Sequence, residues 1–284
     1  MEVTLHNATK KLCVIGDPVL HSKSPLIHNT MIRALGLDYI YLCQPVAAGQ
    51  AAPWLQAAKL ADYAGFNATM PHKLDLVPLM DELDEDAALY RSVNTVCIKG
   101  GKVYGHNTDG RGFVQALADA GLSPKGLQVV LLGAGGAAKA VALKLVQQGA
   151  DKVTVCNRTP EKAAELCQHN PGVMEAAGFD PACLRTHAAT ADLLVNCTSL
   201  GMAGTGGVFG DLSFLDVLPR EAVVCDLIYH PAQTALLRRA QQGGHRALNG
   251  LGMLIYQAVY ALEHFADVNI DAAAMRRRLE QVLT

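Results

Sequence analysis

Residues 129–138 carry the sequence Val129-Val130-Leu131-Leu132-Gly133-Ala134-Gly135-Gly136-Ala137-Ala138. The four leading apolar residues are typical of a buried parallel strand, and residues 139–148 have helical spacing. A second apolar run, at residues 153–156, predicts the next strand. Strand, glycine turn, helix and strand within about thirty residues predict the βαβ unit that binds dinucleotides.

Each small residue of the turn has an expected role. Gly133 allows a sharp turn, Gly135 leaves room for a pyrophosphate, and the small residues 136–138 let the helix pack close to the strand. The helix N-terminus presents free N–H groups and a partial positive charge to the phosphates. The alternative is a tight turn without a ligand, but three glycines in four positions give more freedom than a plain turn requires.

The residues after the second strand indicate which dinucleotide binds. An NAD site usually has an acidic residue there, which bonds the ribose 2′-hydroxyl. This chain has Asn157, Arg158 and Thr159, with Lys162 shortly after them. A guanidinium and an ammonium suit a 2′-phosphate, so we predict NADP. A solvated arginine at a strand end is the alternative.

The composition is that of an ordinary globular protein. The 284 residues are 50% hydrophobic and 18% charged, and the net charge of −2 does not suggest a nucleic acid or membrane partner. No apolar run is long enough to span a membrane, and residues 1–11 lack a signal-peptide core. The eight cysteines form no CxxC motif and the ten histidines show no ligand spacing. We therefore predict a cytoplasmic protein without a metal site.

The N-terminal part alternates predicted strands with predicted helices, which indicates a second, smaller α/β sheet. Ser22 and Ser24 bracket a helix start; one serine is enough for a cap, so the second suggests a bound small anion. Lys73 follows a strand at a predicted helix start, where ligands collect in open sheets. Asp109 by itself is most simply a helix N-cap. The strands are expected at residues 12–16, 39–46, 64–69, 93–98 and 102–105, and the helices at 26–35, 54–60, 74–83 and 112–120.

The alternation continues after Arg158. The loop at 203–210 is rich in glycine and is expected to be mobile, and the three arginines at 276–278 are expected to form a solvated helix face. Strands are expected at 191–197 and 222–226, and helices at 160–168, 234–242, 254–265 and 272–283.

Seven motifs, in order, cover nearly the whole chain, and together they resemble those of shikimate dehydrogenases. They are His21-Ser22-Lys23-Ser24-Pro25, Asn67-Ala68-Thr69-Met70-Pro71-His72-Lys73, Val93-Asn94-Thr95, Asn107-Thr108-Asp109-Gly110, Gly133-Ala134-Gly135-Gly136-Ala137, Asn157-Arg158-Thr159 and Gly250-Leu251-Gly252-Met253-Leu254.

The resemblance implies an NADP-dependent oxidoreductase (EC 1.1.1.25) that reversibly reduces 3-dehydroshikimate to shikimate in the chorismate pathway of aromatic amino acid biosynthesis. It implies two α/β lobes with a cleft between them: an open-sheet substrate domain (1–120 plus 250–284) and a Rossmann-like NADP domain (121–249). The chain is expected to be a monomer or homodimer.

The resemblance also implies roles for single residues. Lys73 and Asp109 match the catalytic pair, and Ser22 and Ser24 match the groups that hold the substrate carboxylate. Further substrate contacts match Thr69, Asn94, Tyr229 and Gln257. Cofactor contacts match Gly133, Ala134, Gly135, Gly136, Ala137, Asn157, Arg158, Thr159, Lys162, Leu227 and Gly250.

Some positions depart from the family pattern. Arg91-Ser92 stands where Gly-Ala is usual, His72 replaces a common Phe, Met70 a common Val, and Ala138-Lys139 a common Ser-Arg. The first two departures are expected near the substrate, so a quinate or aminoshikimate dehydrogenase of the same family stays open. A non-catalytic nucleotide sensor or a methylene-tetrahydrofolate dehydrogenase fits less well, because the paired serines, Lys73 and Asp109 are all present.

Overall fold

The chain divides into two compact units. The computed structural model describes residues 5–204 and 207–283. Unit 1 contains the described residues up to Gly112 and from Ile255 onward, and unit 2 is Phe113–Leu254. Both divisions fall inside helices, α4 (Asp109–Asp119) and α9 (Leu251–Ala266), so unit 2 is an insertion in the sequence of unit 1.

Unit 1 is built on a mixed six-stranded sheet with the order β2-β1-β3-β5-β6-β4. Strands β1, β2 and β3 are parallel, and β5 runs antiparallel to both β3 and β6. The strands are β1 (Lys10–Gly16), β2 (Tyr39–Pro45), β3 (Tyr63–Ala68), β4 (Glu82–Leu83), β5 (Thr95–Lys99) and β6 (Lys102–His106). The other helices are α1 (Ser24–Ala34), α2 (Ala51–Leu60), η1 (Val77–Leu79), α3 (Glu85–Tyr90) and α10 (Ala272–Leu283).

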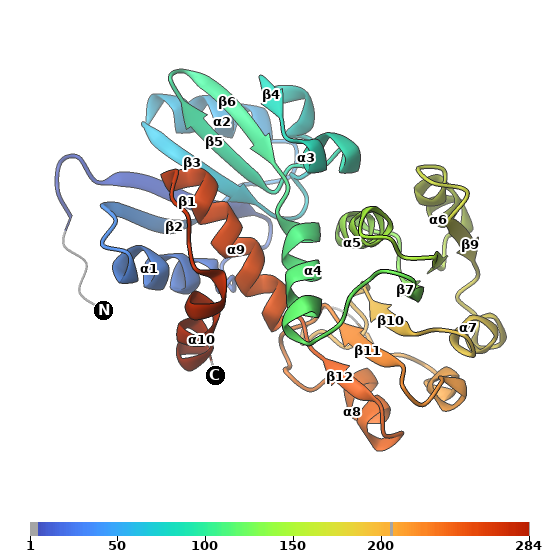
Figure 1. Ribbon diagram of the computed structural model, residues 1–284. Helices are drawn as coiled ribbons and strands as arrows, with labels where there is room; N and C mark the ends of the chain where they lie inside the picture. Colours follow the sequence, from blue (N-terminus) through green and yellow to red (C-terminus); the bar gives the residue numbers. More distant parts are fainter. Residues whose placement is uncertain (1–4, 205–206, 284) are drawn as a thin grey trace. The chain divides into compact units, whose positions relative to one another are not determined.

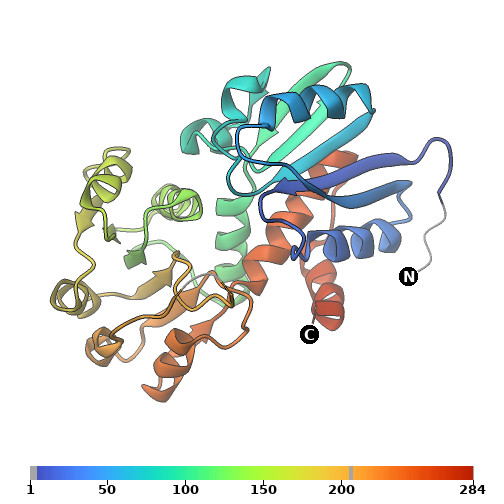
Figure 2. The ribbon, with the colours of Figure 1, turned by 180° about the vertical axis from the view of Figure 1, so that it is seen from behind.

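Helices cover both faces of this sheet (Figures 1 and 2). Phe66 of β3 belongs to a core cluster with Leu55 of α2, whereas the adjacent Gly65 lies against the ring of Phe265 in α9. Because neighbouring residues of a strand point to opposite faces, α2 and α9 cover opposite sides. A methyl group on Gly65 would lie 2.8 Å from the Phe265 ring and 2.4 Å from the Val96 carbonyl oxygen, so glycine is required at this position.

Unit 2 has a six-stranded sheet with the order β12-β11-β10-β7-β8-β9 and only parallel pairs. Counted from β7, this is the 3-2-1-4-5-6 order of the Rossmann fold, with the switch point between β7 and β10. The strands are β7 (Gln128–Leu132), β8 (Lys152–Cys156), β9 (Met174–Ala177), β10 (Leu193–Asn196), β11 (Val223–Asp226) and β12 (Arg246–Leu248). The helices that lie wholly in unit 2 are α5 (Gly136–Gln147), α6 (Pro160–Cys167), α7 (Pro181–Ala188), η2 (Ser213–Val217) and α8 (Ala235–Gln242).

The helix predicted at 74–83 is wrong. The segment forms turns, with the short η1 and then β4. Pro78 has no N–H to donate to the carbonyl of Leu74, and its ring would clash there, so an α-helix cannot run through this position. Short elements that the pattern did not indicate are α3, β9, α7 and β12.

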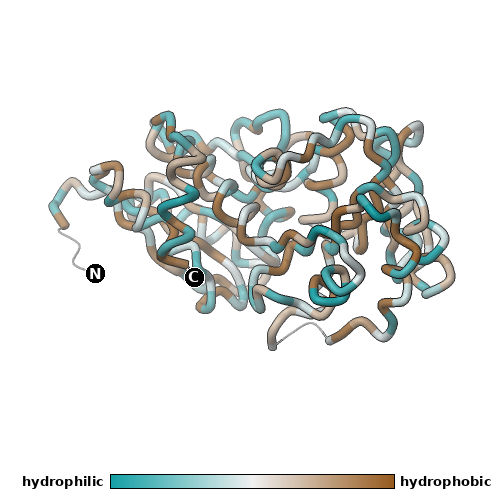
Figure 3. Tube along the Cα trace, turned by 60° about the horizontal axis from the view of Figure 1, so that its bottom comes forward, coloured by the Kyte–Doolittle hydropathy of each residue, from teal (hydrophilic) through white to brown (hydrophobic). Residues whose placement is uncertain are grey.

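The arginines of α10 do not all form a solvated face. Arg277 and Arg278 are exposed, but Arg276 is half-buried and pairs with Glu280 at 2.8 Å. Met275 and Leu279 form the buried side of the helix, and the hydropathy colours alternate along it (Figure 3).

The predicted loop at 203–210 includes residues 205–206, which lie outside the described residues. In the part of the chain that the structure covers, no helix combines the length and apolar character needed to cross a bilayer.

Candidate active site

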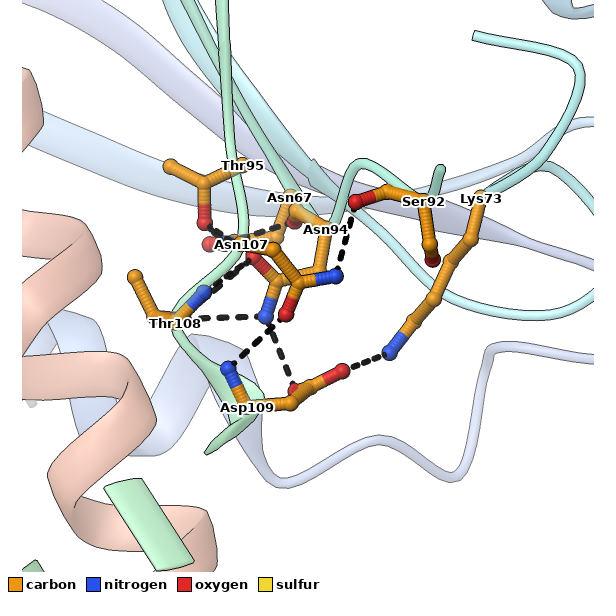
Figure 4. A network of polar contacts seen from close by, with 8 residues as sticks. All are labelled: Asn67, Lys73, Ser92, Asn94, Thr95, Asn107, Thr108 and Asp109. Atoms are coloured by element: carbon orange, nitrogen blue, oxygen red, sulfur yellow. Dashed lines mark hydrogen bonds and ion pairs between the residues drawn. The ribbon is translucent and has the colours of Figure 1, made fainter. Parts of the chain in front are cut away.

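Lys73 and Asp109 form a close ion pair in unit 1 (Figure 4). Lys73 lies in the loop after β3, and Asp109 is the first residue of α4. The Lys73 Nζ lies 2.5 Å from Asp109 Oδ2, and their side chains are 21% and 9% exposed. The loop is held in place because the Val93 N–H donates to the Lys73 carbonyl at 2.8 Å.

Asn94 holds the other oxygen of Asp109. Its Nδ2 donates to Asp109 Oδ1 at 2.9 Å and to Thr108 Oγ1 at 3.0 Å, and its Oδ1 accepts from the Thr108 N–H at 3.0 Å. Asn107 Oδ1 accepts from the Asp109 N–H at 3.1 Å, and its Nδ2 donates to the Ser92 carbonyl at 2.8 Å. The carboxylate orientation is therefore set by a buried network and is not that of a simple cap.

This network leaves the ammonium group available to a ligand. An ammonium has three donors, and Asp109 accepts from one of them. Within the described part of the chain, Lys73 Nζ makes no other hydrogen bond. A partly exposed cation held by a fixed carboxylate can donate to an oxygen atom that develops negative charge.

The hydroxyl groups of Ser22 and Ser24 differ in their hydrogen bonds. α1 begins at Ser24, its N-cap is Lys23, and no side chain caps it. Ser22 Oγ accepts from the Ser24 N–H at 3.2 Å, whereas the Ser24 hydroxyl has no hydrogen bond to any described residue. Capping therefore does not account for Ser24, and its hydroxyl can serve a ligand.

Thr69 and Gln257 also lie in unit 1 and are half-buried. A methyl group on Gly16 would lie 2.4 Å from Thr69 Cγ2, and one on Gly112 would lie 2.7 Å from the Gln257 backbone nitrogen. Glycine at these two positions thus lets both residues approach the neighbouring backbone. Tyr229 lies in unit 2, after β11, where burial raises the pKa of its phenol.

The glycine turn of unit 2 contains two different kinds of glycine. Gly133 has φ +106°, and a methyl group there would lie 3.0 Å from Thr198 Cγ2. Gly135 and Gly136 are exposed, and a methyl group on either would contact nothing within 4 Å. The fold itself thus requires Gly133, whereas the space beside the other two at the N-terminus of α5 is open to an anion.

One expected role in this turn is wrong. Gly136 was expected, with Ala137 and Ala138, to let the helix pack close to the strand. The structure leaves Gly136 exposed and Ala137 half-buried, and Ala138 alone is fully buried. Ala138 therefore provides the close packing.

Of the predicted 2′-phosphate residues, Asn157, Arg158 and Thr159 follow β8 directly, and Lys162 lies in the first turn of α6. Arg158, Thr159 and Lys162 are exposed, and Asn157 Nδ2 donates to the Thr159 carbonyl at 2.8 Å. Within the described residues, neither Arg158 nor Lys162 has an ion-pair partner. Both cations are therefore available to a phosphate.

Leu227 and Gly250 are in direct backbone contact. A methyl group on Gly250 would lie 1.9 Å from the Leu227 carbonyl oxygen, and the Gly250 N–H donates to the Ile228 carbonyl at 3.1 Å. These two predicted cofactor residues therefore lie side by side in unit 2.

A buried network next to them was missed in the sequence. Asp226 Oδ1 accepts from Asn196 Nδ2 at 3.0 Å and from the Ile228 N–H at 3.1 Å, and Oδ2 accepts from Thr234 Oγ1 at 2.7 Å. Burial raises the pKa of Asp226, although these hydrogen bonds oppose the shift. The detectable signal was a polar residue at the end of each of two buried strands, Asn196 in β10 and Asp226 in β11.

Comparisons with known proteins cover almost the whole chain. Residues 14–96 match the family described as the shikimate dehydrogenase substrate binding domain, residues 116–202 match shikimate / quinate 5-dehydrogenase, and residues 250–280 match the shikimate 5′-dehydrogenase C-terminal domain. The shikimate dehydrogenase (NADP(+)) of Alkaliphilus metalliredigens is 42% identical over 282 residues, with 98% of each chain covered.

Two solved structures show the same fold. Shikimate 5-dehydrogenase from Thermus thermophilus, in complex with NADP(H) and shikimate, has a TM-score of 0.83 and 31% identity, with 96% of this chain and 99% of that chain covered. Quinate dehydrogenase from Corynebacterium glutamicum, in complex with NAD, has a TM-score of 0.85 and 33% identity, with 96% and 99% covered.

Proposed function

Because this chain belongs to the shikimate dehydrogenase family, we propose that Lys73 and Asp109 carry out the family's reaction. The chain is an NADP-dependent oxidoreductase of the shikimate pathway, which interconverts 3-dehydroshikimate and shikimate (EC 1.1.1.25). The observation that carries the proposal for the two residues is the 2.5 Å ion pair, buried on the Asp109 side and open on the Lys73 side.

When bound, NADPH supplies the hydride that reduces the ketone carbon of the substrate. Negative charge develops on the ketone oxygen, and the Lys73 ammonium stabilises this charge and donates the proton that completes the hydroxyl. Asp109 holds the ammonium in place and accepts from substrate hydroxyls. In the reverse direction the Lys73–Asp109 pair takes the proton back from the hydroxyl.

Unit 1 holds the substrate in this proposal. The Ser22 and Ser24 hydroxyls bind the carboxylate, and the uncommitted hydroxyl of Ser24 supports this assignment. Thr69 and Gln257 contact ring hydroxyls. Both N–H groups of the Asn94 side chain are given to Thr108 and Asp109, so Asn94 acts on the substrate chiefly by holding Asp109. A further contact comes from Tyr229.

Unit 2 holds NADP. The open N-terminus of α5 fits a pyrophosphate, because nothing within 4 Å fills the space beside Gly135 and Gly136. Ala134 and Ala137 complete this turn. Arg158 and Lys162, with Asn157 and Thr159, bind the 2′-phosphate, while Leu227 and Gly250 complete the pocket.

A substitution experiment tests the roles of the pair. We expect Lys73→Ala to lower kcat by about 10²–10⁴-fold with little change in NADPH affinity, because the proton donor is lost while unit 2 is untouched. Lys102→Ala is a matched control, since Lys102 also pairs with a carboxylate, Glu82, but is 61% exposed. Near-normal turnover in Lys73→Ala would exclude Lys73 from the mechanism.

A substrate survey tests specificity. Shikimate, quinate and aminoshikimate are each assayed with NADP and NAD, and shikimate with NADP should give the highest kcat/KM. Of the two departures that left quinate open, Arg91-Ser92 lies at the end of α3, where Arg91 is exposed and Ser92 buried. The other, His72, is buried in the loop after β3, with Nε2 2.8 Å from the Val46 carbonyl oxygen. A higher kcat/KM for quinate with NAD would instead favour the activity named for the Corynebacterium glutamicum relative.

The cellular compartment and the oligomeric state of the enzyme are also part of the proposal. All eight cysteines are free, which supports a reducing, cytoplasmic compartment. The prediction of a monomer or homodimer is tested by light scattering of the purified chain.

A further inference from the structure

Three metal-ligating residues meet in unit 1, outside the pair described above. Asp84 is the N-cap of α3, His106 ends β6, and His264 lies in α9. One ligand atom from each lies within 4.8 Å of the other two, and all three residues are half-buried. The imidazole rings stack with centroids 3.9 Å apart and an interplanar angle of 16°, and His106 Nδ1 lies 3.2 Å from Asp84 Oδ2.

We propose that Asp84, His106 and His264 bind a divalent transition metal ion, with Zn²⁺ as the ion best suited to the donor set. Two imidazole nitrogens and one carboxylate oxygen are the ligands of many three-residue zinc sites, in which water takes the fourth position. The three residues come from three distant elements, so no local sequence spacing reveals them.

A cavity beside the rings supports the proposal. It has a volume of about 360 Å³ and is lined by both histidines and by Glu263, Asp267 and Lys99. Water can therefore reach both histidines, and the Asp267 carboxylate on the lining favours a cation.

Two neighbouring cations, Lys99 and Arg111, partly offset the negative charge of the carboxylates around the cavity. Lys99 lines the cavity, and Arg111 is near enough to His264 to disfavour protonation of that ring. The Arg111 guanidinium lies over the Tyr260 ring at 3.6 Å and 3.8 Å from Glu263 Oε2, so it offsets the charge of that lining carboxylate.

Both oxygens of the Asp84 carboxylate already have partners in the absence of an ion. Asp84 Oδ1 accepts the capping bond from the Ala87 N–H at 2.6 Å, and Oδ2 is hydrogen-bonded to His106 Nδ1 at 3.2 Å. A metal ion at Oδ2 therefore has to replace the bond to His106.

Binding must change the ring stack. The lone pair of an imidazole nitrogen lies in the ring plane, so two nearly parallel rings direct their lone pairs side by side. One ring has to tilt for both nitrogens to reach one ion. The alternative is a stacked pair that only packs, and a metal titration separates the two.

The site is close to the catalytic network without sharing its residues. The His106 carbonyl accepts from the Asn94 N–H at 3.0 Å, and Asn107, Thr108 and Asp109 follow His106 directly. The proposed metal site uses none of the residues in the proposed catalytic roles, so a failed metal titration would leave those roles unaffected.

The test is a titration of the metal-stripped full chain with Co²⁺, followed by visible absorption of the bound ion, and then competition with Zn²⁺. We expect one ion per chain, displaced by Zn²⁺. His106→Gln and His264→Gln should each weaken Co²⁺ binding by at least about tenfold. His6→Gln is a matched control, because His6 is exposed and outside the cluster, and it should bind as the wild type does.

The variant Asp84→Asn distinguishes the loss of a metal ligand from a folding defect. Asparagine caps helices as well as aspartate does, so this variant keeps α3 while it removes the charged ligand. Weaker Co²⁺ binding in Asp84→Asn, with an unchanged circular dichroism spectrum, supports the site. Equal binding by wild type and the folded variants would place the ion elsewhere, for example on cysteines, and would overturn the proposal, as would the absence of saturable binding.

Discussion

Replacing Gly135 by alanine should weaken the binding of NADPH without destabilising the fold. Gly135 has φ −82° and ψ −176°, an extended conformation open to any residue, and the added methyl group would meet nothing within 4 Å. The protein therefore has no need of glycine at this position. If the open space belongs to the pyrophosphate, only cofactor binding will be affected.

The magnitudes follow from these contacts. Without cofactor, Gly135→Ala should change the free energy of unfolding by less than about 0.5 kcal/mol, because the gain from restricting the unfolded chain is offset by the poorer capping of α5 by alanine. With cofactor, a methyl group against the pyrophosphate should cost about 1–3 kcal/mol of binding. This corresponds to a rise of roughly 5- to 150-fold in the Kd for NADPH.

Gly133→Ala is the matched control. Gly133 has φ +106° and Thr198 Cγ2 at 3.0 Å from the added methyl group, so this variant should lose about 1–3 kcal/mol of stability. Urea unfolding without cofactor measures stability, and NADPH fluorescence measures binding. Wild-type NADPH affinity in Gly135→Ala would refute the assignment of the turn, and a loss of stability as large as in Gly133→Ala would refute the steric argument.

Four further predictions concern single positions. Arg91→Gly should stabilise the fold by about 1 kcal/mol in urea, because Arg91 ends α3 with φ +49°, a conformation that glycine adopts freely. Ser92→Ala should also stabilise the fold, by about 1 kcal/mol, because the buried Ser92 hydroxyl makes no hydrogen bond to any residue that the structure describes. A loss of stability would contradict the prediction for either variant. Arg158→Ala should raise the KM for NADP much more than that for NAD, and equal changes would exclude a 2′-phosphate contact. The pKa of His264 is lowered from 6.5 to about 4, so its contribution to stability is present above pH 6.5 and is lost as the pH falls towards 4. With EDTA present, the free energy of unfolding of His264→Gln should therefore fall less steeply than that of the wild type between pH 6.5 and 4.

Strong local patterns made much of the fold predictable. Apolar runs marked β7 and β8, and the glycines between them marked a turn, because a buried parallel strand and a bare helix N-terminus both have a short-range signature. The helix at 74–83 failed because apolar spacing was weighed above Pro78, which cannot donate a hydrogen bond. The strand β9 was missed because Met-Glu-Ala-Ala at 174–177 has neither β-branched residues nor alternation.

The candidate site was harder to predict because its contacts are not local. The order of the motifs pointed to Lys73 and Asp109 only through a family resemblance; local rules alone made Asp109 a cap. The structure brings the two together over 36 positions, with Lys73 at one oxygen of the Asp109 carboxylate and Asn94 at the other. The Asn196–Asp226 network has only a weak signature, a polar residue at the end of each of two strands, and the three-residue cluster at Asp84 has none, because each joins elements that meet only in the folded unit.

The insertion of unit 2 into unit 1 sets an order for folding on the ribosome. A nascent chain that ends at residue 254 has every residue of unit 2, as well as Lys73 and Asp109, but it lacks the Phe265 ring that covers Gly65. Unit 1 therefore finishes folding only after synthesis has passed through α9, by closing contacts that are very distant in the sequence. A prematurely terminated chain would leave uncovered the sheet face that carries Gly65 and its neighbour Leu12 of β1, and would expose this surface to chaperones and proteases.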